Sequence, residues 1–195
     1  MKPLLIGLSG KAGSGKSTVG DYLTGAHGYV QFAFAGALKE VVCLAFGFSE
    51  EQFYGSRKEA VDPRWGVSPR WCLQWLGTEV FRSRWPDIWI RHLRQEILEF
   101  LSLNGQRPVV VTDVRFKDEA AALKKMRGVL VRLERHEDHR LEAGATEHLS
   151  ETDLDGWEGW NHVIDNNGTL QDLADMVEVM LGLEADKAEL ATAAG

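Results

Sequence analysis

A glycine-rich stretch near the amino terminus carries the clearest chemistry in the sequence. Residues 10–17, Gly-Lys-Ala-Gly-Ser-Gly-Lys-Ser, fit the pattern G-x-x-x-x-G-K-S/T and lie one residue after the apolar run Leu4–Leu8. Successive backbone N–H groups in such a loop bind phosphate oxygens, and a helix that begins there adds partial positive charge. In this pattern Lys16 reaches the β- and γ-phosphates of a nucleotide, and the Ser17 hydroxyl ligates Mg²⁺. The stretch therefore predicts a binding site for nucleotide phosphates.

A second motif suggests what happens to the phosphate. The stretch "VVVTDVRF" is an apolar strand candidate followed by Asp113 and, two residues later, Arg115. A GTPase would carry an N-K-x-D motif late in the chain, which is absent, and a motor or transporter ATPase would often show Asp-Glu after the strand. A small-molecule kinase needs two anion sites and arginines that meet the charge of the transferred phosphoryl group. The D-x-R motif therefore favours a kinase.

The acceptor site of such a kinase is expected in residues 57–92. Five of the seven tryptophans lie there, interleaved with arginines. At about 100° per residue, "RWCLQWLGTEVFR" forms a helix with one apolar face and an opposite polar arc. The apolar face comprises Cys72, Leu73, Leu76 and Val80, and the polar arc comprises Arg70, Gln74, Thr78 and Arg82, with Trp71 and Trp75 on the same side.

That polar arc has two interpretations. Arginine can bind a phosphate, glutamine can bind the edge of a base, and an aromatic ring can pack on the base. Alternatively, the arc is a solvated helix face with tryptophans filling the core behind it. Gly77 either weakens the helix or allows a ligand to approach the backbone closely.

The elements that would position these motifs alternate along the chain. Strands are predicted at Leu4–Leu8, Val30–Phe34, Pro108–Thr112, Val129–Leu133 and His162–Asp165. Helices are predicted at Lys16–Ala26, Ala37–Phe46, Phe116–Met126 and Leu170–Leu181. Short apolar strands separated by helices indicate an α/β fold, a parallel sheet with helices on both faces. Ligands of such a fold bind at the carboxyl ends of its strands.

Composition sets the outer limits. The chain of 195 residues suits a single domain, and it has no apolar run of membrane-spanning length and no signal-peptide pattern. The two cysteines, Cys43 and Cys72, lie in apolar-periodic segments and are expected to be reduced core thiols of a cytosolic protein. The net charge of −7 disfavours binding of polymeric nucleic acid, so an anionic ligand must be bound by a local basic site.

Several motifs together resemble one family. Besides the glycine-rich loop, they are "FAFAGALKE", "LQWLGTEVFR", "VVVTDVRFKDEA", "HLSE" and "VIDNNGTLQDL". They occur in the order seen in phage-type deoxynucleoside monophosphate kinases, over nearly the whole chain. "LQ-x-x-GTE-x-x-R" and "D-x-RF-x-x-EA" are the specific ones. The resemblance implies a three-layer P-loop fold with sheet order 2-3-1-4-5, and Mg²⁺-dependent transfer of the ATP γ-phosphate to a deoxynucleoside 5′-monophosphate.

The resemblance also assigns residues. ATP phosphates would lie on the loop residues Gly13, Ser14, Gly15, Lys16, Ser17 and Thr18, and adenine near Asn166 and Asn167. Lys39, Gln74, Arg82 and Trp89 match the acceptor region, to which the polar arc adds Arg70 and Thr78. Asp113 would orient a Mg²⁺-bound water or the acceptor, and Arg115 would hold the acceptor phosphate. Alternatively, Asp113 only caps the following helix.

A lid at about 134–150 is expected to supply a catalytic arginine. Arg135 is the first candidate, with Arg132 and Arg140 behind it, although Arg135 could instead pair with Glu134 or Glu137 on the surface. The motif residues His148 and Glu151 have no assigned role beyond capping the next helix. The whole is expected to form one kinase domain, residues 1–182, with an acceptor region at about 36–92 and a polar tail at 183–195.

Two other functions stay open from the residues alone. One is a P-loop kinase for another phosphorylated molecule, of the phosphomevalonate or dephospho-CoA type. The other is a module that binds ATP without turnover. The expected partners are ATP and a deoxynucleoside monophosphate, with a homodimer as one option, and the expected location is the cytoplasm, that of the host for a phage protein.

Overall fold

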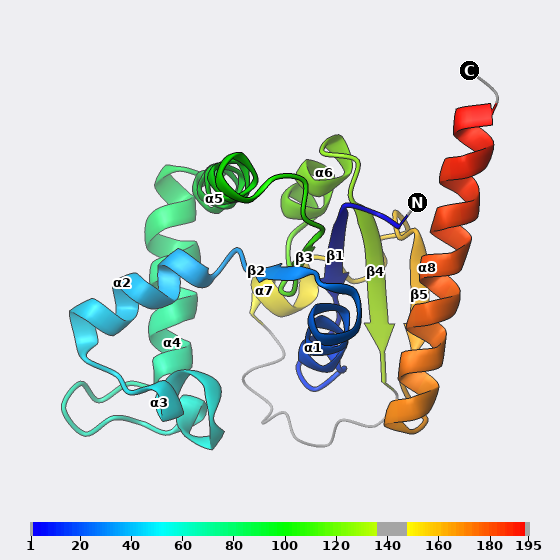
Figure 1. The fold of residues 1–195 in the computed structure, drawn as a ribbon. Coiled ribbons are helices and arrows are strands. Elements are labelled where there is room, and N and C mark those ends of the chain that lie inside the picture. The colour runs from blue at the N-terminus through cyan, green and yellow to red at the C-terminus, as the bar shows by residue number, and fades with distance from the viewer. Residues whose placement is uncertain (1, 136–147, 194–195) are drawn as a thin grey trace. The chain divides into compact units, whose positions relative to one another are not determined.

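A computed structural model of the protein describes residues 2–135 and 148–193 (Figure 1). Most of the expected lid, including Arg140, lies outside these residues. The chain divides into two compact units. Unit 1 comprises Met1–Ala33 and Ile97–Gly195, and unit 2 comprises Phe34–Glu96.

Unit 1 is built on a parallel sheet of five strands in the order β2-β3-β1-β4-β5, which confirms the predicted order. The strands are β1 (Leu5–Ser9), β2 (Val30–Phe32), β3 (Val109–Val111), β4 (Val129–Glu134) and β5 (His162–Asp165). β1 lies between β3 and β4, with Gly7 opposite Val111 and Ser9 opposite Arg132. The segments that leave the carboxyl ends of these three strands therefore share one edge of the sheet.

Helices cover both faces of the sheet, as predicted. The helices of unit 1 are α1 (Lys16–His27), α6 (Lys117–Lys125), α7 (Leu149–Thr152) and α8 (Leu170–Ala193). Side chains alternate along a strand, so Ile6 and Leu8 share one face, where they join a buried cluster with residues of α1 and α8. Gly7 faces the other side, where a Cβ atom would lie 2.6 Å from Leu123 of α6. The absence of a side chain at Gly7 lets α6 pack directly on β1.

The last helix is longer than predicted. The apolar periodicity predicts a helix over Leu170–Leu181, but α8 continues to Ala193 through residues expected to form a polar tail. Glu184 fixes the continuation, because it pairs with His162 of β5 at 2.6 Å and with Lys187 at 2.7 Å. None of the helices in the described part of the chain combines the length and apolar character that crossing a membrane requires.

Unit 2 is helical. It contains α2 (Gly36–Phe46), α3 (Glu50–Tyr54), the 3₁₀-helix η1 (Ser56–Glu59), α4 (Pro69–Gln74) and the π-helix η2 (Trp75–Arg82), and α5 (Ile88–Asn104) runs from this unit into unit 1. Both cysteines of the described chain are free thiols, but only Cys72 is buried. The prediction of a core position is therefore wrong for Cys43, which is exposed on α2.

The helix predicted across residues 70–82 exists, but its second half is a π-helix. The wider turn moves side chains out of the predicted register, so Val80 is 39% exposed and does not belong to the apolar face, whereas Gly77 is buried. A Cβ atom at Gly77 would lie 2.5 Å from Leu38 of α2. The glycine therefore serves close packing between helices within unit 2.

A buried aspartate holds the long connection between α3 and α4. Asp62 accepts hydrogen bonds from Arg64 Nε (2.9 Å) and Nη2 (2.8 Å) and from Gln52 Nε2 (2.9 Å). Arg64 also donates to the Gly47 carbonyl at 3.2 Å, and the Trp65 indole donates to the Phe46 carbonyl at 2.9 Å. The hydrogen bonds from Arg64, and then from Gln52, hold the pKa of Asp62 well below its ordinary value of 3.8. The connection is thereby fastened to α2 and α3.

Replacing Asp62→Asn should lower the melting temperature, because Arg64 loses its charged partner. A lowered carboxyl pKa stabilises the folded state above the ordinary pKa, and this contribution disappears as pH falls through the folded-state value. The difference between wild type and variant should therefore be full near neutral pH and shrink in acid. Thermal melts at several pH values measure it. Asp87→Asn, at the exposed Arg91 pair, is the control and should change little; equal effects of the two variants would contradict the assignment.

Candidate active site

The glycine-rich loop joins β1 to α1 in a form that needs glycine. Gly10, Gly13 and Gly15 have φ angles of 150°, 76° and 100°. A Cβ atom at Gly10 would also lie 2.5 Å from the Leu133 carbonyl oxygen, so the loop passes too close to β4 for a side chain. α1 begins at Lys16 with no side-chain cap at Gly15. Its first N–H groups therefore remain available for an anion, as a phosphate-binding loop requires.

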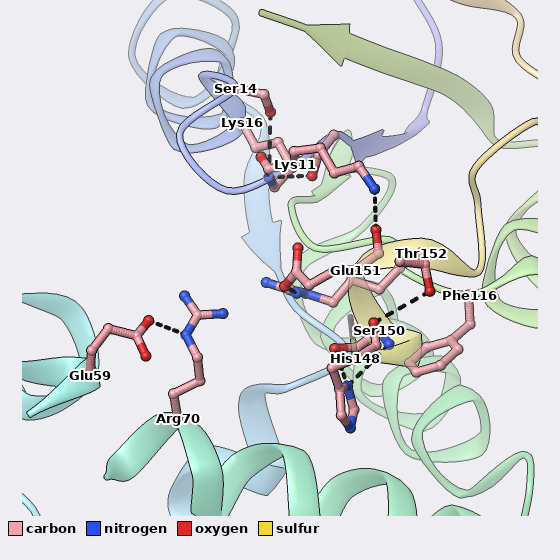
Figure 2. A network of polar contacts seen from close by, with 12 residues as sticks. Lys11, Ser14, Lys16, Glu59, Arg70, Phe116, His148, Ser150, Glu151 and Thr152 are labelled. Atoms are coloured by element: carbon pink, nitrogen blue, oxygen red, sulfur yellow. Dashed lines mark hydrogen bonds and ion pairs between the residues drawn. The ribbon is translucent and has the colours of Figure 1, made fainter. Parts of the chain in front are cut away.

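Lys16 curls back into this loop. Its Nζ donates to the carbonyl oxygens of Gly10 and Lys11, each at 2.7 Å, and lies 3.5 Å from Ser14 Oγ (Figure 2). The pKa of Lys16 is lowered from 10.5 to about 8. Burial is the largest cause of this shift, and the positive charge of Arg115 is the next. Ser17 and Thr18 are exposed on the first turn of α1. The loop thus holds the part-buried ammonium group of Lys16 among backbone dipoles.

The segment after β3 presents Asp113 and Arg115 at the same edge of the sheet. Glu119 fixes this turn, because its buried carboxylate accepts from the backbone N–H of Arg115 (2.9 Å) and of Phe116 (3.2 Å). α6 begins at Lys117 with Phe116 as its N-cap residue, and Glu119 completes the capping box. The alternative that Asp113 caps this helix is therefore wrong. The charge of Asp113 instead acts on Lys16, whose pKa it raises.

Arg132 in β4 and Arg135 directly after it are two of the arginines predicted as catalytic candidates. The Arg132 side chain is only 14% exposed, stacks over Trp160 with 5.6 Å to the ring centre and lies 3.8 Å from Asp155. Its charge lowers the pKa of Lys16, which places it in the electrostatic environment of the loop. Arg135 is exposed and is the last described residue before position 148. The structure therefore brings Arg132 to the loop more clearly than Arg135.

The two asparagines expected near adenine have other contacts. Asn166 is buried and donates to the Ser14 carbonyl at 3.0 Å. A Cβ atom at Gly15 would lie 2.3 Å from its amide nitrogen, so Asn166 supports the loop from β5 at very close range. Asn167 donates to the carboxylate of Asp165. Asn166 therefore shapes the phosphate loop directly.

Apart from Arg115, which belongs to unit 1, the predicted acceptor residues lie in unit 2. Arg70 pairs with Glu59, and Lys39 lies over the Tyr54 ring at 4.3 Å from its centre. Gln74 ends α4, and its Nε2 is buried with no hydrogen-bond partner among the described residues. Thr78 and Arg82 follow on the π-helix and are half-buried.

Aromatic side chains of this region fall into two groups. Trp71 and Trp75 are 46% and 37% exposed and stack on each other, with ring centres 5.3 Å apart and planes at 16°. Trp89, which was expected to contact the acceptor, is buried, and its Nε1 donates to the Gly77 carbonyl at 3.0 Å. Its contacts within unit 2 support the π-helix.

Comparison with known proteins decides between the kinases that the loop allows. A model of the family described as deoxynucleotide monophosphate kinase matches residues 57–177, more than half of the chain. This chain belongs to that family. A protein of Acanthamoeba polyphaga mimivirus named "Putative deoxynucleotide monophosphate kinase" is 33% identical over 185 residues, which cover 89% of this chain and 94% of the viral protein. The predicted family and its kinase activity, ATP-dependent phosphorylation of a deoxynucleoside monophosphate, are confirmed.

Solved structures support the fold alone. TT1252 from Thermus thermophilus is 22% identical and has a TM-score of 0.54, with 97% of this kinase and 99% of TT1252 covered. A gluconokinase from Sinorhizobium meliloti 1021 is 18% identical with a TM-score of 0.53 and 97% of each chain covered.

Three residues of the kinase's phosphate site make contacts that the sequence did not predict. Glu119 belongs to the motif after β3 but had no predicted role, and its carboxylate accepts from the backbone N–H of Arg115. Lys11 donates to the Glu151 carbonyl (Figure 2). Glu151 also forms an ion pair with Arg115, and Lys11 pairs with Asp155 at 2.7 Å. The acid of "D-x-RF-x-x-EA", four residues after the arginine, could have indicated the first contact. No local pattern indicates the others, because their partners are distant in sequence.

The lowered pKa of Lys16 predicts the pH dependence of the kinase. kcat/KM for ATP follows ionisations of the free enzyme, so it should fall as pH rises through about 8 and Lys16 loses its proton. Bound phosphates raise the pKa of the lysine, so kcat should stay level to higher pH. Steady-state rates from about pH 6.5 to about 9.5 measure both.

Lys16→Arg is the control for this profile. Its guanidinium stays charged over the whole range, so its kcat/KM, whatever its size, should lack the fall near pH 8. The same fall in the arginine variant would assign the ionisation to another group.

Proposed function

We propose that Lys16 and the backbone of residues 10–17 bind the triphosphate of ATP, and that unit 2 binds the deoxynucleoside monophosphate. The observation that carries this proposal is the part-buried ammonium of Lys16, which two carbonyl oxygens of the glycine-rich loop hold, with Arg115 and Arg132 as charged neighbours. Such a concentration of cations and N–H groups suits a triphosphate and the charge that spreads over the transferred phosphoryl oxygens.

Binding of the triphosphate would redirect Lys16. Its present acceptors are two neutral carbonyl oxygens of the loop, and a charged phosphate is a stronger acceptor for an ammonium group. Arg115 lies 33% exposed on a turn fixed by Glu119, so its guanidinium is both positioned and accessible to an anion. We assign Arg115 to the phosphoryl group or the acceptor phosphate.

Mg²⁺ fits the residues at this edge of the sheet. The ion prefers oxygen ligands and usually combines one or two protein groups with water and substrate phosphates. The Ser17 hydroxyl is exposed on the first turn of α1, and the carboxylate of Asp113 is close enough to raise the pKa of Lys16. Ser17 would bind the ion directly and Asp113 directly or through water. The ion would supply charge neutralisation between the phosphates.

The reaction needs no general base on the acceptor. A nucleoside monophosphate attacks with a phosphate oxygen that is already anionic, so positioning and electrostatics do most of the work. Asp113 is therefore assigned to metal binding and orientation, and the arginines to charge stabilisation. This division agrees with Glu119, rather than Asp113, being the group that shapes the turn.

For the acceptor, unit 2 offers a cation, an amide and aromatic rings on one helical segment. The amide nitrogen of Gln74 is buried and has no partner in the described ranges 2–135 and 148–193, and a carbonyl or ring nitrogen of a base would accept from it. Trp71 and Trp75 present an exposed aromatic pair on which a planar base can stack. Arg70 and Arg82 are the assigned phosphate contacts. A homodimer and a cytoplasmic location remain predictions.

ADP formation from Mg-ATP across a panel of acceptors tests the function. The panel contains the principal deoxynucleoside monophosphates, their ribose counterparts, phosphomevalonate and dephospho-CoA. We expect turnover with deoxynucleotides, and Lys16→Ala should reduce kcat by at least about a hundredfold while the protein stays folded. Turnover only with phosphomevalonate or dephospho-CoA would overturn the acceptor assignment. ATP binding without turnover of any acceptor would overturn the catalytic one.

Gln74→Met separates a ligand-binding amide from a structural one. Methionine has a similar length and no polar atoms, so it removes the orphaned donor and should leave the melting temperature unchanged or raise it. The acceptor KM should rise about tenfold or more, while the ATP KM changes little. Thermal melts and steady-state kinetics test both parts. A lower melting temperature with an unchanged acceptor KM would make the amide structural.

A further inference from the structure

The short helix α7 and the residues that follow it contact three segments of the phosphate site in unit 1, namely the glycine-rich loop, the segment after β3 and strand β4. Lys11 of the glycine-rich loop donates to the backbone carbonyl of Glu151 and pairs with the carboxylate of Asp155 at 2.7 Å. The backbone N–H of Lys117, at the start of α6, donates to Asp153 at 2.7 Å. Residues 148–155 are called the bracket below, because they tie the segments after β1 and β3 to each other.

The bracket ends in carboxylates that match the cations of the site. Glu151 forms an ion pair with Arg115, and Asp155 lies 2.7 Å from Lys11 and 3.8 Å from Arg132. The same arginines and the charge of Glu151 all act on Lys16. Two acids of one eight-residue segment therefore face three cations that come from three different elements.

The bracket is itself well supported. His148 caps α7, because its Nδ1 accepts from the Ser150 N–H at 3.2 Å and lies 2.8 Å from Ser150 Oγ (Figure 2). The neutral ring then carries its proton on Nε2. The expected capping role of His148 is thus present, and it fixes the turn from which Glu151 projects.

We propose that Glu151 is a positioning residue, which holds the guanidinium of Arg115 in the orientation that phosphoryl transfer requires. This inference rests on the proposed role of Arg115 in the reaction. Only Nη1 of Arg115 is directed to Glu151, so the guanidinium keeps further donors for a phosphate. Glu119 fixes the backbone at Arg115 through its hydrogen bonds to two backbone N–H groups. Glu151 holds the guanidinium group at the other end of the Arg115 side chain.

A second possibility is that Glu151 takes the place of a phosphate and must leave when ATP binds. Its surroundings argue against this. The Glu151 side chain is 6% exposed, against 33% for Arg115, and Lys11 holds the Glu151 backbone. A carboxylate that exchanged with a ligand would need room to move and access to solvent. Glu151 therefore lies behind the arginine, with the open side of the guanidinium left for the ligand.

A double-mutant cycle tests the inference in the full-length kinase. Arg115→Ala should lower kcat about a hundredfold or more, and Glu151→Gln about tenfold, with smaller changes in the KM for ATP. If Glu151 acts through Arg115, Glu151→Gln should lower kcat by less than about twofold in the Arg115→Ala background. Glu158→Gln, at an exposed acid nearby, is the matched control and should leave kcat unchanged.

Each other outcome has a definite meaning. An equal loss from Glu151→Gln in both backgrounds would show an effect independent of Arg115 and overturn the inference. A raised kcat or tighter ADP binding in Glu151→Gln would show that the carboxylate competes with phosphate, and would also overturn it. If Arg115→Ala keeps full kcat, the proposed role of Arg115 fails, and the inference fails with it. If only Glu151→Gln keeps full kcat, the inference alone fails.

Glu151→Asp keeps the test decisive if the glutamine variant does not fold. It retains the charge on a shorter side chain, so it should fold and show a kcat between wild type and Arg115→Ala. Melting temperatures of all variants identify loss of folded protein. Lys11→Met removes the contacts of Lys11 with the bracket. If both Glu151→Asp and Lys11→Met fold and keep full activity, the bracket does not set the geometry of the site.

Discussion

The donor site depends on holding several positive charges close together in a folded chain. Like charges a few ångströms apart repel one another strongly where water is excluded. The pKa of Lys16 reflects the charges around it, because Arg115 and Arg132 lower the pKa while Glu151 and Asp113 raise it. Burial is the largest effect, so the pKa of the Lys16 ammonium group is about 8 instead of 10.5. A phosphate entering this site would relieve the repulsion among the cations, and its binding is favoured for that reason.

The backbone of the glycine-rich loop also stabilises the positive charge of Lys16. The loop gives Lys16 two carbonyl acceptors, and this requires a path with positive φ angles at Gly10 and Gly15. Both glycines also face neighbours that leave no room for a Cβ atom, namely the Leu133 carbonyl and the Asn166 amide. The loop is therefore shaped by β4 and β5 as well as by its own glycines. A glycine-rich loop without these neighbours would be free to move, and its ordering would cost more conformational entropy on binding.

The sequence predicted the parts of this kinase that depend on local patterns. Buried strands show as apolar runs and the loop as a spaced motif, so both were found from the residues. The sheet order was implied by the family resemblance, and it agrees with the structure. Contacts between distant segments leave no local pattern, which is why the contact between Lys11 and Glu151, 140 positions apart, was not predicted. The π-helix was not predicted either, because its wider turn depends on packing, and within unit 2 Gly77 leaves room for Leu38. The alternation of charged and apolar residues along the end of α8 likewise gave no sign of its contacts with β5.

Each unit contains one polar group whose surroundings a structural role alone does not explain. Lys16 is hydrogen-bonded to two carbonyl oxygens, but burial and two neighbouring arginines disfavour its charge. The Gln74 amide nitrogen is buried and has no hydrogen-bond partner among the described residues. Native proteins pair nearly all buried polar groups, because an unpaired one lowers stability by about 1–3 kcal/mol. Phosphate oxygens would stabilise the charge of Lys16, and an acceptor atom of a base would pair with Gln74, so these two groups match the two substrates of the reaction.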